Sequence, residues 1–382
     1  MEIRCERETR NKYAIQAAID RCPESGGTVI VPEGIWESGP LHLKSNLKLY
    51  LEKGCEIRFS QTMEDYLPPV FTRWEGVECY NYSPFIYAKD CHNITIAGPG
   101  KLNGQGEAWW PWKKLQQQAA NQLCRAESAD IPPKKRVFGT REAALRPSFL
   151  QIIRCKNVNL FDFTIINGPQ WTIHPVYCKE VTARGLTILT EGPNTDGFNP
   201  DSCEHVLIEN CTFQTGDDCI AVNSGLNEDG WRVNRPCRYV EIRNCLFLGG
   251  HAAVAIGSGM SGGVENIWVH HCIMKNVERG IRIKSMQGRG GYVKNVQFDH
   301  IKARNIQEEV IQVSMNYGSS TAVPVSATVP KFSDLNFSYI TSENAKVGIS
   351  LCGLPESPIR HIHFSNIEMK NCKKSFESEY TE

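Results

Sequence analysis

The chain has 382 residues, of which 41% are hydrophobic, and its 42 basic and 42 acidic residues give a formal net charge of zero. A neutral chain has no overall basic field to attract nucleic acid or an anionic membrane, and no apolar stretch is long enough to span a bilayer. The apolar content suits a folded protein with a large core and excludes a disordered chain.

The N-terminal residues Met1 to Glu6 lack the basic and then apolar pattern of a secretory signal peptide. Many of the 16 cysteines, such as Cys203, Cys211 and Cys245, lie in strand-like segments, where a reduced thiol acts as a small apolar side chain. We therefore expect a cytoplasmic protein, or a secreted one if a leader was removed. Disulfides remain the less favoured alternative.

The first predicted element is a helix over residues 12–21, where apolar residues recur at helical spacing before Pro23 and Gly26-Gly27 end the pattern. Short β-rich runs follow it. A stack of strands has an open end that needs a cover, so we predict that this helix caps the first strands.

Residues 105–150 interrupt the β-rich pattern. They contain three tryptophans within residues 109–112 and then a polar, helix-like stretch from Lys113 to Ala126. Because long loops in compact folds are often functional, we interpret this segment as a loop insertion on a single domain that spans residues 1–382.

The most informative feature is a repeated segment in which apolar and polar residues alternate and Asn or His precedes Cys or Ile. Its copies are Val206–Phe213, Val240–Phe247, Ile267–Met274, Val296–Ala303 and Ile362–Met369, with weaker copies at 158–163 and 335–340. From residue 206 onward the copies begin 27 to 39 residues apart. A fixed element at variable intervals indicates the coils of a solenoid, and an apolar period of two excludes a helical one. The prediction is an all-β, parallel β-helix, and a β-propeller is disfavoured because most intervals are too short for a four-stranded blade.

Aligning successive coils predicts which residues are neighbours in space, since stacked strands lie about 4.8 Å apart. The coil with Asp217 and Asp218 aligns without gaps with the coil that contains His251, which places His251 beside Asp217. Matching Phe198 to Ile220 places Asp196 beside Asp218. In the following coil Ile281 and Ile283 continue the inward columns, so Arg282 and Lys284 must face outward on the same wall.

Three carboxylates, one imidazole and two cations are thus predicted to meet on one exposed patch. Crowded carboxylates repel each other, so at least one of them should have a raised pKa. Such a set suits glycoside hydrolysis, with Asp217 as the acid and Asp196 with Asp218 as paired bases that hold the attacking water. A water between acid and base implies carboxyl groups about 6.5–9.5 Å apart and inversion at the anomeric carbon. Arg282 and Lys284 would bind the carboxylate of a uronic acid.

These residues also resemble a known family. Asn194-Thr195-Asp196, Gly216-Asp217-Asp218, Gly250-His251 and Arg282-Ile283-Lys284 look like the four signature motifs of glycoside hydrolase family 28, the polygalacturonases. The resemblance implies a right-handed parallel β-helix, inverting hydrolysis and no metal or other cofactor. It assigns the acid to Asp217, the water-holding carboxylates to Asp196 and Asp218, and the residue that tunes the acid to His251.

The same resemblance assigns substrate binding to Arg282 and Lys284 and, by looser matches, to Tyr317, His174, Arg289 and Asn194. One departure stands out, because the family usually has Gly-His-Gly and here Ala252 follows His251. We expect its methyl group to narrow the site or to shift His251. The tryptophans of residues 109–112 would either stack on sugar faces or pin the insertion to the body.

Residues 223–237 resemble an insertion of exo-acting and rhamnogalacturonan-type members. With the 105–150 loop, it would close one end of the groove, so we expect release of single galacturonate units from chain ends of pectin, polygalacturonate or its oligomers. Alternatives are internal cleavage, a rhamnogalacturonan- or xylogalacturonan-directed hydrolase, a calcium-dependent pectate lyase on the same fold and a non-catalytic carbohydrate-binding solenoid.

Overall fold

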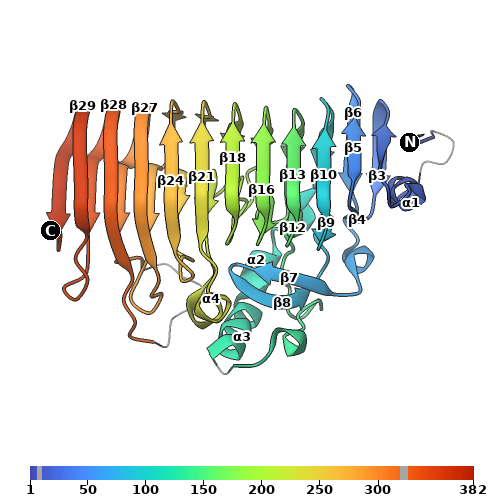
Figure 1. The fold of residues 1–382 in the computed structure, drawn as a ribbon, viewed down its shortest axis with the longest axis horizontal. Helices are drawn as coiled ribbons and strands as arrows, with labels where there is room; N and C mark the ends of the chain where they lie inside the picture. The colour runs from blue at the N-terminus through green and yellow to red at the C-terminus, as the bar shows by residue number, and fades with distance from the viewer. Residues whose placement is uncertain (7–10, 129, 319–325) are drawn as a thin grey trace.

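A computed structural model describes residues 1–6, 11–128, 130–318 and 326–382 (Figure 1). It is a right-handed parallel β-helix, as predicted, in which the strands of each coil lie beside those of the next. The helices are α1 Ala14–Arg21, α2 Trp112–Leu115, α3 Gln117–Ser128 and α4 Asn227–Val233, with 3₁₀ turns at Met63–Tyr66, Gly106–Ala108 and Pro133–Lys135.

The strands of the first half are β1 Glu2–Arg4, β2 Gly27–Val31, β3 Gly34–Ser38, β4 Leu41–His42, β5 Leu47–Leu51, β6 Cys55–Phe59, β7 Val70–Trp74, β8 Val77–Asn81, β9 Ile86–Lys89, β10 His92–Ala97, β11 Lys101–Asn103, β12 Leu150–Ile153, β13 Lys156–Phe161, β14 Thr164–Ile166, β15 Ile173–Val176, β16 Lys179–Arg184 and β17 Thr187–Leu189. Those of the second half are β18 Glu204–Glu209, β19 Thr212–Gln214, β20 Ile220–Val222, β21 Cys237–Arg243, β22 Leu246–Phe247, β23 Ala252–Ile256, β24 Val264–His270, β25 Ile273–Lys275, β26 Arg279–Lys284, β27 Tyr292–Ser314, β28 Lys331–Cys352 and β29 Arg360–Glu379.

The repeated Asn or His marks a bend between two strands of one coil. Asn210, Asn244, His271 and His300 all have a positive φ, between 51° and 54°. Asn and His tolerate this left-handed conformation better than most residues, and it turns the chain so that the following Cys or Ile points inward. The repeated Asn or His in the sequence is therefore explained by the left-handed backbone conformation that each coil needs at this bend.

Inward-facing side chains form columns along the axis. Phe213 stacks on Phe247 with ring centroids 5.5 Å apart, and Phe298, Phe337 and Phe364 continue the same kind of stack in later coils. Such columns remove apolar surface from water in every coil, which is the main stabilising contribution to a solenoid.

The cysteines occupy the same kind of position as the apolar residues. Of the 16 cysteines, 12 are buried. Cys211, Cys245 and Cys272 align in one column because their flanking strands pair in register. The expectation that these thiols act as small apolar side chains is confirmed for these residues.

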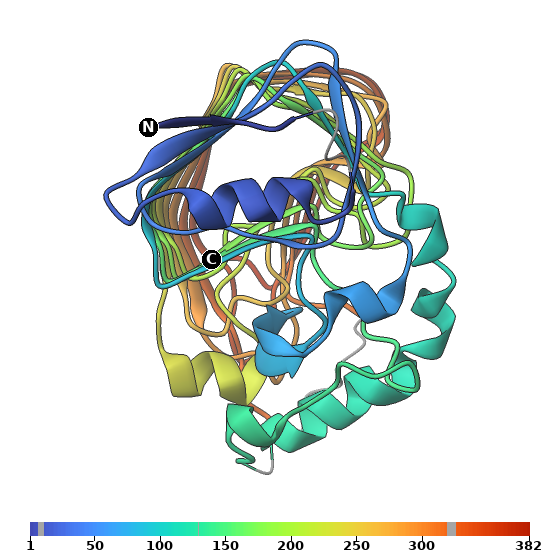
Figure 2. The ribbon, with the colours of Figure 1, turned by 90° about the vertical axis from the view of Figure 1, so that its right-hand side faces the viewer.

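Helix α1 lies across the open N-terminal end of the coil, as predicted (Figure 2). Its Ile15, Ala18 and Ile19 are buried and belong to the main core. The helix begins at Ala14 and ends at Arg21, close to the predicted range.

The 105–150 segment contains α2 and α3, which confirms the predicted helical stretch. These helices lie with α4 and the β7–β8 hairpin on one side of the coil (Figures 1 and 2). Trp109 is fully buried against Tyr66 and Phe85, and the indole of Trp110 donates to the carbonyl oxygen of Gly168 at 3.0 Å. These tryptophans pin the insertion to the body.

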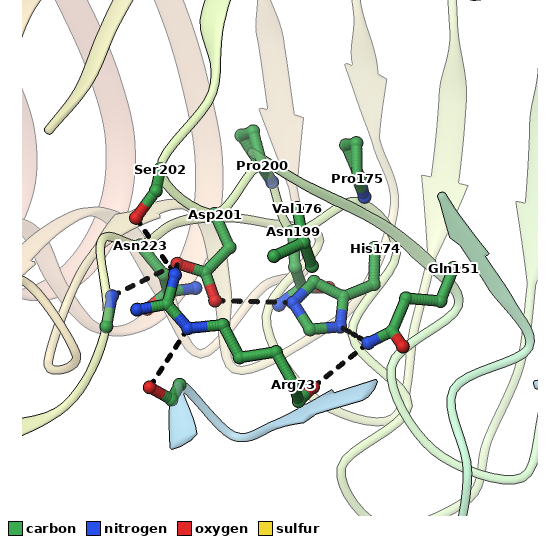
Figure 3. A network of polar contacts seen from close by, with 12 residues as sticks. Arg73, Gln151, His174, Pro175, Val176, Asn199, Pro200, Asp201, Ser202 and Asn223 are labelled. Atoms are coloured by element: carbon green, nitrogen blue, oxygen red, sulfur yellow. Dashed lines mark hydrogen bonds and ion pairs between the residues drawn. The ribbon is translucent and has the colours of Figure 1, made fainter. Parts of the chain in front are cut away.

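A buried polar network fastens the β7–β8 hairpin to the coil (Figure 3). The guanidinium of Arg73 in β7 pairs with the carboxylate of Asp201 at 2.8 Å, and both side chains are fully buried. Arg73 also donates to the hydroxyl of Ser202 at 2.9 Å and to the carbonyl oxygen of Gly76 at 3.0 Å. Gln151 completes the network by donating to the carbonyl oxygen of Arg73 at 2.9 Å.

None of the helices within the described ranges is both long and apolar enough to cross a membrane.

Replacing Asp201 tests the strength of this attachment. Asp201→Asn leaves the Arg73 charge buried without a compensating carboxylate, so we expect a loss of about 3–5 kcal/mol in the free energy of unfolding. Urea-induced unfolding, followed by circular dichroism, measures the difference. Asp90→Asn is the matched control, because Asp90 pairs with Arg154 at 2.6 Å on the surface and its loss should cost less than about 1 kcal/mol. Equal losses in the two variants would contradict the anchoring role.

Candidate active site

A cavity of about 610 Å³ lies on the outer wall of the coil, beside β20, β23 and β26. Its lining includes every residue of the predicted catalytic set: Asp196, Asp217, Asp218 and His251. The predicted register is confirmed. Phe198 pairs with Ile220, and the β20–β23 register continues to the pair of Asp217 and His251, whose backbones are joined by a 3.0 Å hydrogen bond.

The three aspartates converge closely. One carboxylate oxygen from each of them lies within 4.8 Å of the other two. The expected separation of 6.5–9.5 Å was therefore wrong for the nearest oxygens, because Asp217 and Asp218 are consecutive residues and Asp196 is one coil away. Gly216 allows this approach, since a Cβ at that position would lie 2.1 Å from the carbonyl oxygen of Gly192.

Asp217 is the most exposed of the three and is held from two sides. Its Oδ1 lies 3.1 Å from Nδ1 of His251, and its Oδ2 accepts from the side-chain amide of Asn194 at 3.4 Å. Burial favours the neutral acid, but the hydrogen bond and the charge of His251, with that of Lys284, outweigh it and lower the pKa of Asp217. The same hydrogen bond raises the pKa of His251.

Asp196 is buried and accepts a hydrogen bond at 2.8 Å from the side chain of Asn199. Burial, followed by the charges of Asp217 and Asp218, raises the pKa of Asp196 well above its usual range. The predicted raised pKa therefore occurs in this cluster, at Asp196.

Asp218 differs from the other two because it has a cationic partner inside the cluster. Its Oδ2 accepts from Nζ of Lys284 at 2.6 Å, and both side chains are largely buried. Its Oδ1 is buried and makes no hydrogen bond within the described residues. One oxygen of this carboxylate is thus held in place by Lys284, while the other has no hydrogen-bond partner within the described residues.

Arg282 and Tyr317 complete the wall beyond Lys284. Both line the cavity. The Arg282 guanidinium and the Lys284 ammonium lie 5.4 Å and 5.3 Å from the ring centre of Tyr317. Nε of Arg282 donates to Gln312 at 3.0 Å, which fixes the orientation of its side chain.

Arg146, from the 105–150 insertion, supports the cluster from behind. It is fully buried and donates to Asn194 Oδ1 at 2.8 Å and to the carbonyl oxygens of Pro193 and Pro169 at 2.7 Å and 3.1 Å. Burial lowers the pKa of Arg146 to about 10, which still leaves it charged at neutral pH. Arg146 therefore orients Asn194, which in turn contacts Asp217.

The remaining predicted positions have different outcomes. Arg289 lines the cavity although its side chain is buried, and Asn194 lines it too. His174 does not line it: the ring is fully buried between Gln151, at 2.8 Å from Nδ1, and Asp201, at 3.4 Å from Nε2 (Figure 3). His174 belongs to the network that fastens the hairpin.

Ala252 also lies outside the cavity lining. It is fully buried and packs with Ala221 and Ala255. Its methyl group fills a space beneath the wall, so the expectation that it narrows the site is not supported by its position.

Sequence reasoning assigned no role to several other residues of the lining, among them Glu75, Lys113, Trp171 and Glu191. Glu75 is at the tip of the β7–β8 hairpin and Lys113 is in α2. These elements lie outside the repeat, so coil alignment assigns them no position. The available signal was weak: Gly76 lies between two β-rich runs, but Glu-Gly is not one of the preferred hairpin pairs.

Known proteins resemble this chain in both sequence and fold. The family model described as glycosyl hydrolases family 28 matches residues 134–382. The chain belongs to this family. The family 28 match spans all three aspartates, His251, Arg282 and Lys284.

Solved structures and curated relatives agree with this membership. An exopolygalacturonase from Thermotoga maritima has 36% sequence identity and a TM-score of 0.94, with coverage of 100% of this chain and 89% of that one. A polygalacturonase from Erwinia carotovora has 25% identity and a TM-score of 0.79, with coverage of 100% and 95%. A probable polygalacturonase from Vitis vinifera is 29% identical over 96% of this family 28 chain and 72% of the relative.

The raised pKa of Asp196 predicts how stability changes with pH. The buried carboxyl of Asp196 is compatible with the folded state while it is protonated, and its ionisation disfavours folding. The free energy of unfolding should therefore fall as the pH rises from about 3.9, the pKa of Asp in the unfolded chain, through the higher pKa of Asp196 in the folded protein. Asn is a neutral isostere, so Asp196→Asn should raise the free energy of unfolding by about 0.5–2 kcal/mol at pH 7 and by almost nothing near pH 4.

Thermal melting at the two pH values checks this prediction. The same variant should lose hydrolytic activity. Higher stability together with lost activity would indicate that the Asp196 carboxyl is kept for function at a cost in stability. A variant less stable than the wild type at pH 7 would contradict the proposed cost of the ionised form.

Proposed function

We propose that this chain hydrolyses the α-1,4-galacturonosyl linkages of polygalacturonate or its oligomers, with inversion and with release of single units from a chain end. The observation that carries the proposal is one cavity in which three carboxyl groups, His251 and two cations meet. Hydrolysis of a glycoside needs an acid and a base on opposite sides of the anomeric carbon, and a uronic acid needs a cation for its carboxylate.

Asp217 is the proposed acid, because it is the exposed carboxyl and touches His251. In the free protein its pKa is lowered, so it must gain a proton when substrate binds. Substrate excludes water from the Asp217–His251 pair, and a desolvated pair favours its neutral form. The proton then moves from His251 Nδ1 to Asp217 Oδ1, and from there to the leaving oxygen as the glycosidic bond breaks.

Asp218 is the proposed principal base. Its buried Oδ1 has no hydrogen-bond partner within the described residues, so it is the natural acceptor for a proton of the attacking water. Asp196 holds the same water from the neighbouring coil. Lys284 donates to the second oxygen of Asp218 and fixes it, which leaves the first one aligned for the water.

Inversion is proposed from this division of roles. Spacing alone would favour a retaining enzyme, since retaining carboxyl groups lie about 5–5.5 Å apart. Here, however, the carboxyl that would attack is bound to Lys284 and is adjacent in sequence to the acid, so a water held by two carboxyl groups is the better nucleophile. Arg282, Lys284 and Tyr317 then receive the leaving sugar and its carboxylate.

Action at a chain end is supported by the elements around the cavity. Glu75 and Gly76 of the hairpin, Lys113 of α2 and Leu226 before α4 line one side of it. These elements are insertions on the coil, and they stand across the direction in which a polymer would continue. The proposal is also in line with the similarity to the Thermotoga maritima exopolygalacturonase.

A cytoplasmic location is proposed from the thiols. Of the 16 cysteines, 12 are buried, and the free thiols of Cys211, Cys245 and Cys272 share one buried column, which suits a reducing compartment. A cytoplasmic enzyme would act on short galacturonate oligomers.

Replacing the acid tests the mechanism. Asp217→Asn cannot donate a proton, so kcat on polygalacturonate should fall by about 10²–10⁴-fold while the melting temperature stays near that of the wild type. Asp90→Asn, whose side chain is outside the cavity lining, should keep wild-type activity. Full activity of Asp217→Asn would refute the assignment of the acid.

Product analysis tests the rest. NMR should detect β-galacturonate first, as single units, and a chelator should leave the rate unchanged. An unsaturated product or loss of activity in chelator would instead identify a lyase. Activity only on rhamnogalacturonan or xylogalacturonan would change the substrate, and mixed oligomers would indicate internal cleavage.

A further inference from the structure

Glu75 occupies an unusual position for an acidic side chain. It forms a two-residue turn with Gly76 between Trp74 and Val77, and the two residues have φ values of 44° and 91°. Such a turn requires a positive φ at both residues, which Asn-Gly satisfies readily. Glu is less suited to it, and a left-handed residue other than Gly or Asn costs about 1–2 kcal/mol.

The backbone around Glu75 is held rigidly despite this cost. The Arg73 guanidinium, paired with Asp201, donates to the carbonyl oxygen of Gly76 at 3.0 Å (Figure 3). The next residue after the turn, Val77, is buried, and the backbone amide of Glu78 donates to Asp229 of α4 at 2.9 Å. Strain that is held in place by its surroundings often marks a functional position.

The Glu75 side chain points towards the catalytic cluster. It lines the same cavity as Asp217, and its Oε1 accepts from the side-chain amide of Gln170 at 3.0 Å. Burial raises the pKa of Glu75, and the charges of Lys113 and Arg146 oppose that rise. A carboxyl group in this cavity besides the three aspartates repels the carboxylates of a galacturonate chain, so it needs a compensating contact with another part of the substrate.

The order of the coils indicates which part of the substrate that is. In the proposed function the leaving sugar is received by Arg282 and Lys284, which belong to β26, in the coil that follows His251. The sugar that is released therefore lies on the other side of Asp217, towards the coil of Asp196 and the hairpin tip. When single units are released, this sugar is the non-reducing terminal residue, and its only feature absent from an internal residue is a free hydroxyl at carbon 4.

We propose that Glu75 recognises the free non-reducing end of the substrate by accepting a hydrogen bond from its 4-hydroxyl. This inference rests on the proposed function and names the residue that selects the chain end. An internal residue has no hydrogen on its 4-oxygen, and the next sugar attached there would meet the rigid hairpin tip. The oxygen of Glu75 that does not accept from Gln170 is the proposed acceptor of this hydrogen bond.

A pair of substrates that differ in this hydroxyl tests the inference. The measured quantity is the ratio of kcat/KM for trigalacturonate to kcat/KM for its analogue that is 4-deoxy at the non-reducing end. Loss of a hydrogen bond to a carboxylate should give the wild-type enzyme a ratio of roughly 10 to 100. In Glu75→Gln the ratio should fall several-fold, and in Glu75→Asn it should approach one, because the shorter side chain cannot reach the hydroxyl.

The two variants and one control keep the test independent of folding. Asn-Gly is the preferred pair for this turn, so Glu75→Asn should preserve the hairpin and the melting temperature. Glu107→Gln is the control: Glu107 also accepts from an amide, that of Asn167 at 2.6 Å, but it is exposed and outside the cavity lining. It should keep the wild-type ratio.

A wild-type ratio in both Glu75 variants would overturn the inference and leave Glu75 as a partner of Gln170 only. That outcome is distinct from failure of the proposed function. A wild-type protein that hydrolyses neither trisaccharide would refute the proposed function and this inference together.

Discussion

The register between stacked coils is the constraint on which the rest of the molecule depends. Parallel strands pair residue by residue, so Asp217 is held beside His251, and Asp196 beside Asp218, by the same backbone hydrogen bonds that build the coil. A shift of one residue in any coil would turn these side chains into the core. The columns of buried Phe, Ile and Cys prevent such a shift because every coil must keep its apolar face inside.

Within that register, neighbouring charges give three similar carboxyl groups different properties. Asp218 pairs with Lys284, Asp217 contacts His251, and Asp196 accepts from the amide of Asn199 beside two negative neighbours. The proton of the cluster is therefore favoured at Asp196 in the free protein. Substrate binding has to redistribute it, which makes the Asp217–His251 hydrogen bond central to the proposed cycle.

Alignment of coils predicted the part of the site that belongs to the coils. Asp196, Asp217, Asp218, His251, Arg282 and Lys284 all line one cavity because each occupies a fixed place in the repeat. The capping helix and the helices of the insertion also followed from local patterns. The positions of Glu75, Lys113 and Arg146 did not, because they depend on how the hairpin and the insertion fold back onto the coil. His174 was misplaced for a related reason: a loose match to the family suggested a substrate contact, whereas its burial and its bonds to Gln151 and Asp201 are tertiary features.

The attachment of the hairpin has a mechanical consequence. Asp201, which receives the Arg73 guanidinium, is five residues after Asp196 in the same short segment of chain. Any force that lifts the hairpin away from the coil is therefore transmitted directly to the segment that carries Asp196, one of the proposed catalytic carboxyl groups. Heating that loosens the hairpin should therefore disturb the position of Asp196 at the same time. The catalytic rate would fall before the cavity opened enough to allow internal cleavage of a polymer.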